Sequence, residues 1–320
     1  MADLKPNPLK LLLPLWPHQP YEVCAMPELP EVETVIRGLS PVLMGRRIAR
    51  AEVRRSGLRF PFPADFAARL QNRQFTGLRR RAKYILATLD DGNCLLIHLG
   101  MTGRFTVLNK SAVPNSLGEF YYHSAETGSG AHDHLVLTLD TGTQVVYTDP
   151  RRFGIMDLFH ESESQTHKLL KDIGVEPLGN EFNGAYLAKH FKGKSAPLKA
   201  ALLDQQIIAG LGNIYVSEVL HRAGLSPKRA AKTLAGKRAQ DIRLDHIARH
   251  VREVLGEAIL AGGSTLRDFA GADGNEGAFQ QRFAVYDRAN DNCVKPGCHG
   301  VIRRIVQSGR STFYCPKCQK

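Results

Sequence analysis

The sequence lacks a run of apolar residues long enough to cross a membrane. A transmembrane helix needs roughly 20 such residues, whereas the best candidate, LKLLLPLW at residues 9–16, is short and is interrupted by Pro14. Polar residues follow it directly, which makes it a poor signal-peptide core, although the VCA before Met26 faintly resembles a cleavage site. We therefore expect no membrane association and no secretion, and we place the protein in the cytoplasm.

The six cysteines do not have the even spread of a disulfide framework. Four of them form two close pairs near the C-terminal end, in CVKPGC and in CPKC, and sixteen residues lie between the pairs. Closely spaced pairs around a hairpin-length insert are typical of a tetrahedral zinc site. We therefore predict one structural zinc ion on Cys293, Cys298, Cys315 and Cys318. Four free thiols in a hairpin would be the alternative, but exposed thiols at this spacing would oxidise.

The sequence has fewer acidic than basic residues. The 31 aspartates and glutamates face 43 lysines and arginines, which gives a formal net charge of +12. Such a surplus favours a polyanionic partner, nucleic acid above all, although a basic, fully solvated surface is also compatible with it.

The chain shows no internal repeat and changes character twice. Short alternating apolar runs with DDG and DTG turns predict an antiparallel β-sandwich after a first helix that starts near Pro30, and helical periodicity then takes over. We predict an α+β protein with an extension at 1–25, a β-sandwich at 26–172, a linker at 173–183, a helical domain at 184–282 and a zinc-bearing β-hairpin at 283–320.

Two further stretches have the composition of functional elements. The segment AGLGNIYVSEVL puts two glycines before a new helix, where free backbone amides can bind a phosphate. Asn213 stands at this junction, as a helix cap or as a phosphate ligand. The upstream Lys194 and Lys199 favour contact with a DNA backbone. The zinc hairpin carries Arg310 at its tip, which also suits nucleic acid.

Six motifs together resemble the bacterial formamidopyrimidine-DNA glycosylases. They are PELPEVETV, RRRAKYIL, HLGMTG, TDPRRFG, GLGNIYVSE and GRSTFYCPKCQK, and they stand in the family's order from Met26 to Lys320. The resemblance implies a helix-two-turn-helix motif in the helical domain. It also implies a bifunctional DNA glycosylase and AP lyase of base-excision repair, which removes 8-oxoguanine and formamidopyrimidines from damaged double-stranded DNA and cuts the strand by β,δ-elimination. The family expectation for oligomeric state is a monomer.

The resemblance also implies four catalytic residues. Pro27 would be the nucleophile, because a free N-terminal secondary amine can form an iminium with the sugar. Glu28 matches the catalytic acid, with a helix-start acid like Glu31 as the alternative. Lys83 matches the proton donor for β-elimination, although a plain phosphate contact is also compatible, and Arg310 matches the donor for δ-elimination.

The extension conflicts with this mechanism. If residues 1–25 remain, the nitrogen of Pro27 is an amide and cannot form a Schiff base. A start codon assigned too early explains the conflict best, and proteolytic trimming or an inactive extended form are the alternatives.

Six residues match the family's DNA contacts. Met101, Arg151 and Phe153 would fill the gap left by a flipped base, although Met101 and Phe153 taken alone would more often be core residues. His132, Lys194 and Asn213 would contact the backbone, and a buried structural histidine is the alternative for His132. The glycine-rich residues 264–283 are a candidate lid over the base, and residues 109–131 form a long polar loop without an assigned role.

Two other functions remain open. One is an endonuclease VIII-like enzyme that removes oxidised pyrimidines. The other is a non-catalytic lesion-binding protein, which requires that the extension is retained.

Overall fold

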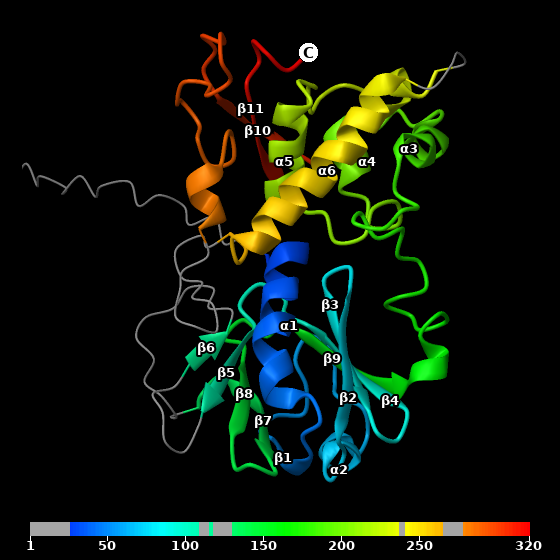
Figure 1. Cartoon of the computed structure of the whole chain (residues 1–320), viewed down its shortest axis with the longest axis vertical. Coiled ribbons are helices and arrows are strands. Elements are labelled where there is room, and N and C mark those ends of the chain that lie inside the picture. The colour runs from blue at the N-terminus through cyan, green and yellow to red at the C-terminus, as the bar shows by residue number, and fades with distance from the viewer. Residues whose placement is uncertain (1–25, 109–114, 118–129, 237–240, 265–277) are drawn as a thin grey trace, which may run out of the picture.

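The structure is a computed structural model, and it describes residues 26–108, 115–117, 130–236, 241–264 and 278–320. The extension, most of the polar loop and most of the candidate lid lie outside these residues. The fold consists of a β-sandwich, a helical part and a small β-hairpin beside the helices (Figure 1). The predicted α+β class is confirmed. No helix among the described residues is long and apolar enough to span a bilayer.

The first helix, α1 (Leu29–Leu43), connects the sandwich with the helical part. A proline in its first turn and an apolar stripe through Val32, Val35 and Leu39 account for its formation. Its body packs on the sandwich, whereas its first turn lies near the helical part, as Figure 1 shows. The residues that begin α1 are thereby brought to the boundary between the two parts.

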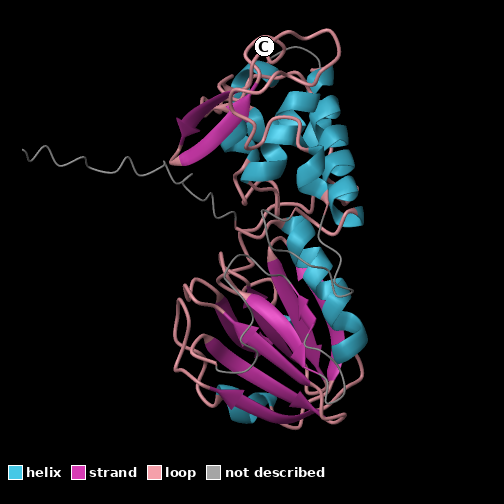
Figure 2. Ribbon diagram, turned by 90° about the vertical axis from the view of Figure 1, so that its left-hand side faces the viewer, coloured by secondary structure: helices cyan, strands magenta, loops and turns pink. Residues whose placement is uncertain are grey.

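The sandwich consists of two antiparallel sheets that face each other (Figure 2). One has the order β1-β7-β8-β5-β6 and the other β2-β3-β4-β9, and their inner side chains form one core together with α1 and α2 (Phe66–Leu70). The strands of the first sheet are β1 (Ile48–Val53), β5 (Arg104–Leu108), β6 (Asn115–Leu117), β7 (Asp133–Leu139) and β8 (Gln144–Thr148). Those of the second are β2 (Phe75–Arg81), β3 (Tyr84–Leu89), β4 (Asn93–His98) and β9 (Ile155–His160).

The helical part has its own hydrophobic core, separate from that of the sandwich. Its helices are α3 (Gly184–Phe191), α4 (Leu198–Leu202), α5 (Asn213–Arg222) and α6 (Ile242–Leu260). The hairpin of β10 (Arg303–Gln307) and β11 (Arg310–Tyr314) packs on α5, and Phe313 and Cys315 join the helical core. Ser308 and Gly309 form its two-residue turn, both with positive φ, as a tight hairpin requires.

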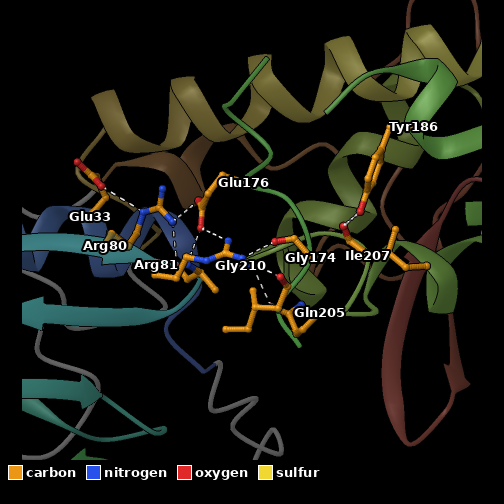
Figure 3. Close-up of polar contacts among 11 residues, drawn as sticks. Glu33, Arg80, Arg81, Gly174, Glu176, Tyr186, Gln205, Ile207 and Gly210 are labelled. Carbon is orange, nitrogen blue, oxygen red and sulfur yellow. Dashed lines mark hydrogen bonds and ion pairs between the residues drawn. The ribbon is translucent and has the colours of Figure 1, made fainter. Parts of the chain in front are cut away.

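Residues 173–183 connect the sandwich to the helices and are held by arginines of the β2–β3 hairpin (Figure 3). Arg80 donates to Glu176 Oε2 (2.7 Å) and to Glu33 of α1 (3.2 Å), and Arg81 donates to Glu176 Oε1 (2.9 Å) and to the carbonyl of Gly174 (2.7 Å). The backbone N–H of Gly174 donates in turn to the carbonyl of Gln205 (2.8 Å). This chain of contacts joins α1, the β2–β3 hairpin and the loop before α5.

Candidate active site and nucleic-acid interface

A cavity of about 530 Å³ lies where the sandwich, the helical part and the hairpin meet. All three parts of the molecule contribute residues to its wall. They include Met26, Glu28, Lys83, Tyr84, His98, Met101, Gly212, Asn213, Tyr286 and Arg310. Of the four predicted catalytic residues, Glu28, Lys83 and Arg310 thus line one cavity, and Pro27 is buried between the lining residues Met26 and Glu28.

Glu28 is the buried acid of this cavity, with 3% of its surface exposed. Its Oε1 accepts a hydrogen bond from the backbone N–H of Ile214 in the first turn of α5 (3.0 Å), whereas its Oε2 has no partner. Gly212 allows this approach, because a Cβ atom there would lie 2.1 Å from the carboxyl carbon of Glu28. Burial raises the pKa of Glu28 to about 7 against the opposing effect of Lys83, so the carboxyl group can donate a proton near neutral pH.

Glu31 is buried nearby, but both of its carboxylate oxygens accept hydrogen bonds from within the protein. Its Oε2 accepts from the backbone N–H of Glu28 (3.0 Å), and its Oε1 accepts from the backbone N–H and hydroxyl of Ser264 (both 2.8 Å) and from the hydroxyl of Tyr215. The two neighbouring acids therefore differ: Glu31 fixes the start of α1, whereas Glu28 keeps one oxygen for another partner.

Lys83 stands in the turn between β2 and β3, not within a strand. Ala82 precedes it with φ +51°, and the backbone N–H of Ala82 donates to Glu176 (2.7 Å), which fixes the turn. Burial lowers the pKa of Lys83, and Arg310 lowers it further while Glu28 opposes the decrease. The adjacent Arg79 pairs with Glu161, so all three arginines of the motif are engaged within the protein.

Arg310 is exposed at the start of β11, and a buried lysine anchors its strand. The ammonium of Lys199 donates to the carbonyl of Ser311 (2.9 Å) and to the hydroxyl of Thr312 (2.7 Å). Burial lowers the pKa of Lys199 to about 7. We expected Lys199 near the DNA backbone, but it is 1% exposed and connects α4 to the hairpin instead. Its place in the apolar run PLKAALL was the signal for this burial.

The residues predicted to fill the flipped-base gap come from two adjacent turns. Met101 is half-buried in the turn after β4 and lines the cavity. Arg151 and Phe153 are exposed in the turn after β8, with the guanidinium carbon 4.8 Å from the ring centroid. Phe153 is 44% exposed, so the core alternative does not apply to it.

The three predicted backbone contacts lie in different settings. His132 is exposed, and the buried histidine of the HDH motif is His134. Lys194 pairs with Asp204 (3.0 Å) at the start of the loop that leads to α5. Asn213 is the first residue of α5, and its buried Oδ1 has no partner. The N-cap is Gly212, so the capping alternative for Asn213 is not seen.

Sequence reasoning missed His98 and Tyr286 in the cavity wall. Burial lowers the pKa of His98 to about 4, so its ring is neutral at neutral pH. Tyr286 lies in a segment held by the buried carboxylate of Glu218, which accepts from the backbone N–H groups of Val285 (3.0 Å) and Tyr286 (2.8 Å). His98 opens the motif HLGMTG, which was the available signal for it, whereas Tyr286 has no local pattern that predicts its place at the site.

The four cysteines form a metal site of the predicted kind. Their sulfur atoms all lie within 4.8 Å of one another, and two of the separations are 3.8 Å and 3.6 Å. Tetrahedral zinc with Zn–S bonds of about 2.3 Å requires sulfurs about 3.8 Å apart, so the donor set fits one structural zinc ion. His221 near the end of α5 places its Nε2 3.4 Å from Cys293 Sγ.

Three family models match the chain. They describe the N-terminal domain of formamidopyrimidine-DNA glycosylase (residues 26–156), its H2TH domain (173–270) and the zinc finger found in FPG and IleRS (293–320).

Proteins with the name formamidopyrimidine-DNA glycosylase are similar along their whole length. That of Beijerinckia indica is 56% identical, and that of Rhizobium johnstonii 53%, each over 92% of this chain and 100% of the relative. The crystal structure of MutM (Fpg) from Thermus thermophilus covers 92% of this chain and 98% of its own, with 36% identity and a TM-score of 0.75. The Lactococcus lactis Fpg, in complex with DNA that contains an abasic site, covers 92% and 100%, with 29% identity and a TM-score of 0.77. The cavity, the cysteine cluster and these matches agree, and the chain belongs to the formamidopyrimidine-DNA glycosylase family.

Proposed function

We propose that the protein is a bifunctional DNA glycosylase and AP lyase of base-excision repair. Its substrates are oxidised purines, 8-oxoguanine and formamidopyrimidines, in duplex DNA. The observation that carries this proposal is Glu28, a buried carboxyl group with a pKa of about 7 and one free oxygen, in a cavity that Lys83 and Arg310 also line. A proton donor that shares a cavity with two cations suits a reaction in which a base and then two phosphates leave.

Pro27 is our candidate nucleophile. Its nitrogen attacks C1′ of the damaged nucleotide, the glycosidic bond breaks, and the base leaves with a proton from Glu28, whose carboxylate then takes up the proton of the attacking nitrogen. A proton from Glu28 to the ring oxygen opens the sugar, and the nitrogen lone pair forms the C1′ iminium. In the 320-residue chain this nitrogen is part of a peptide bond, so the reaction requires a chain that begins at Pro27. The family model begins at residue 26, which supports this requirement.

The iminium then acts as an electron sink for strand cleavage. Loss of a proton from C2′ expels the 3′ phosphate in β-elimination, and loss of a second proton expels the 5′ phosphate in δ-elimination. Lys83 and Arg310 are the candidates to donate protons or to stabilise the departing phosphates. The lowered pKa of Lys83 makes its ammonium a better proton donor than an ordinary lysine.

DNA binding uses the surface around the cavity. Met101, Phe153 and Arg151 fill the gap in the duplex, where the guanidinium contacts the orphaned base. His132, Lys194 and Asn213 contact the backbone, and the charge of +12 supports a salt-sensitive affinity. When bound, the zinc ion crosslinks four thiolates and holds the hairpin that carries Arg310.

The names of the relatives favour the purine branch over the endonuclease VIII-like alternative. We further propose that the protein acts as a monomer. With a DNA substrate and bacterial relatives, we place it at the bacterial nucleoid in the cytoplasm. The domains assigned from the sequence, 26–172, 184–282 and 283–320, remain our proposal for its division.

Borohydride trapping tests the mechanism. A chain that starts at Met26, with the methionine removed, should form a reducible covalent adduct with DNA that contains 8-oxoguanine, and peptide mapping should place the adduct at Pro27. The product should be a one-nucleotide gap with phosphates at both ends. An oxidised-pyrimidine duplex in the same assay distinguishes the two lesion classes.

The intact 1–320 chain, verified by mass, is the matched control. It should neither trap nor cut, yet it should keep its affinity for undamaged DNA. Trapping by this chain at full rate, or an adduct on Lys83, would reject Pro27 as the nucleophile.

A further inference from the structure

The two turns that carry Met101, Arg151 and Phe153 are joined by one buried carboxylate. Asp149 is fully buried. Its Oδ1 accepts from the hydroxyl of Thr102, the residue after Met101. Its Oδ2 accepts from the backbone N–H of Gly154, the residue after Phe153 (2.8 Å). One side chain therefore holds both turns.

Thr102 adds a second connection between the same turns. Its hydroxyl donates to Asp149 and also accepts from the backbone N–H of Arg151 (3.2 Å). Gly100 permits the close packing, because a Cβ atom there would lie 2.5 Å from the carbonyl carbon of Phe153. The separation between Met101 and the Arg151–Phe153 pair is therefore fixed by backbone contact as well as by side chains.

The backbone of Asp149 extends the connection to His132. Its N–H donates to the carbonyl of His132 (3.0 Å), and its carbonyl accepts from Nε2 of His134 (2.8 Å) and from the N–H of Arg152 (3.1 Å). Arg152 has φ +56°, which gives the turn its sharp bend between Arg151 and Phe153. Arg151 and His132 are thus bonded directly to Thr102 or Asp149, and Met101 and Phe153 each adjoin a residue, Thr102 or Gly154, that is bonded to Asp149.

We propose that Asp149 and Thr102 are positioning residues that make the two turns enter the DNA as one rigid unit. This inference rests on the proposed function of Met101, Arg151 and Phe153 in filling the flipped-base gap. Neither residue lines the cavity, so neither touches the reacting sugar. Their effect is confined to duplex DNA, where the flipped base leaves a gap opposite the intact strand.

Thr102→Val is the decisive variant. It keeps the shape of the side chain but removes the hydroxyl that donates to Asp149 and accepts from Arg151. We expect the single-turnover excision of 8-oxoguanine from duplex DNA to fall about tenfold, the usual effect of losing a buried hydrogen bond to a charged group. Cleavage of a preformed abasic site in single-stranded DNA should stay unchanged, because no gap exists there.

Thr102→Ser is the rescue variant and should restore the duplex rate. Asp149→Asn should behave like Thr102→Val. The amide has only one acceptor oxygen, so it cannot accept both from the hydroxyl of Thr102 and from the N–H of Gly154. Asp140→Asn is the matched control: Asp140 is an exposed acid of the β7–β8 turn that accepts from Arg47. The zinc-loaded enzyme is used in the form that the trapping experiment shows to be active.

The ratio of duplex to single-strand rates is measured within one preparation, so a smaller folded fraction does not change it. Equal decreases in both rates for Thr102→Val, or an unchanged duplex rate, would overturn the inference. Met101→Ala distinguishes an error in the positioning inference from an error in the proposed function. If Met101→Ala lowers the duplex rate and Thr102→Val does not, only the positioning inference is wrong. If neither wild type nor variants excise the lesion, the proposed function itself is wrong.

Discussion

The backbone N–H of Ile214 donates to Glu28 Oε1 at 3.0 Å, although the two residues are 186 positions apart in the sequence. Ile214 belongs to the first turn of α5, where backbone N–H groups have no partner within the helix. The contact therefore caps α5 and orients the candidate acid at the same time. Each role depends on the other, because a displaced helix would also displace the carboxyl group.

Glu28→Gln should abolish most of the base excision. Glutamine can still accept from Ile214 through its amide oxygen, but it cannot donate a carboxylic proton. We expect the excision rate for 8-oxoguanine to fall about 10²-fold or more, the usual contribution of a general acid. Single-turnover kinetics with duplex DNA measures this effect. Glu31→Gln is the control, and it should lower the melting temperature because Glu31 accepts four hydrogen bonds.

The excision rate should fall as the pH rises through about 7. Glu28 must be protonated to act, and burial raises its pKa to about 7. The rate–pH profile of the wild type should therefore have a descending limb centred near that value, and the residual rate of Glu28→Gln should lack it. A wild-type rate that stays constant from pH 6 to pH 8.5 would contradict the assignment of Glu28 as the acid.

Glu28→Gln should also stabilise the protein at high pH. The pKa of Glu28 is raised from 4.5 in the unfolded chain to about 7 in the fold, so the folded state binds more protons between these values and loses stability as the pH rises. At pH 8 the buried charge costs about 3 kcal/mol at most, and glutamine removes this cost. In thermal unfolding, the melting temperature of the variant relative to that of the wild type should rise from pH 5 to pH 8. A difference in melting temperature that does not change with pH would show that burial does not raise the pKa of Glu28.

Cys298→Ser should release the zinc ion and loosen the hairpin. The hairpin carries Arg310 and packs on α5, so binding to damaged DNA should be lost while the sandwich, which has a separate core, stays folded. Metal analysis, gel-shift titration and far-ultraviolet circular dichroism measure the three properties. Full DNA affinity in zinc-free protein would exclude a role for the zinc site in binding.

His221→Ala should weaken zinc binding without removing a ligand. The ring nitrogen lies 3.4 Å from Cys293 Sγ and can donate to the thiolate, and contacts of this kind typically contribute 10- to 100-fold in metal affinity. We expect faster loss of zinc to a chelator, followed with a colorimetric indicator. Arg222→Ala, which alters the neighbouring residue of α5 and its pair with Glu257, should leave the rate of zinc loss unchanged.

Local patterns in the sequence were sufficient for much of the fold. Proline and acidic residues at the start of α1, the DDG and DTG turns and the cysteine spacing each act over a few residues, and the structure confirms the elements they predict. The motif residues Glu28, Lys83 and Arg310 also meet in one cavity.

Contacts between distant segments were not predictable in this way. Lys199 was expected near a DNA backbone. The apolar run around it signals its burial, but its partners are in β11 and no local pattern points to them. The role of Glu176 in holding Arg80 and Arg81 depends equally on tertiary structure, since Glu176 lies 96 and 95 positions away from them in the sequence. The different roles of Glu28 and Glu31 could be distinguished only from the hydrogen bonds of both carboxylates.

The cap on α5 has a consequence for protein synthesis. Domains fold as they leave the ribosome, the N-terminal part first, so the sandwich can fold around α1 before α5 has been translated. Until then Glu28 has no amide partner and no cavity to bury it, and its carboxyl group should ionise at the ordinary pH of an exposed acid. Arg310 is made later still. A nascent chain therefore carries the sandwich without the burial that makes Glu28 our candidate acid, and we expect activity only after the last hairpin has packed on the helices.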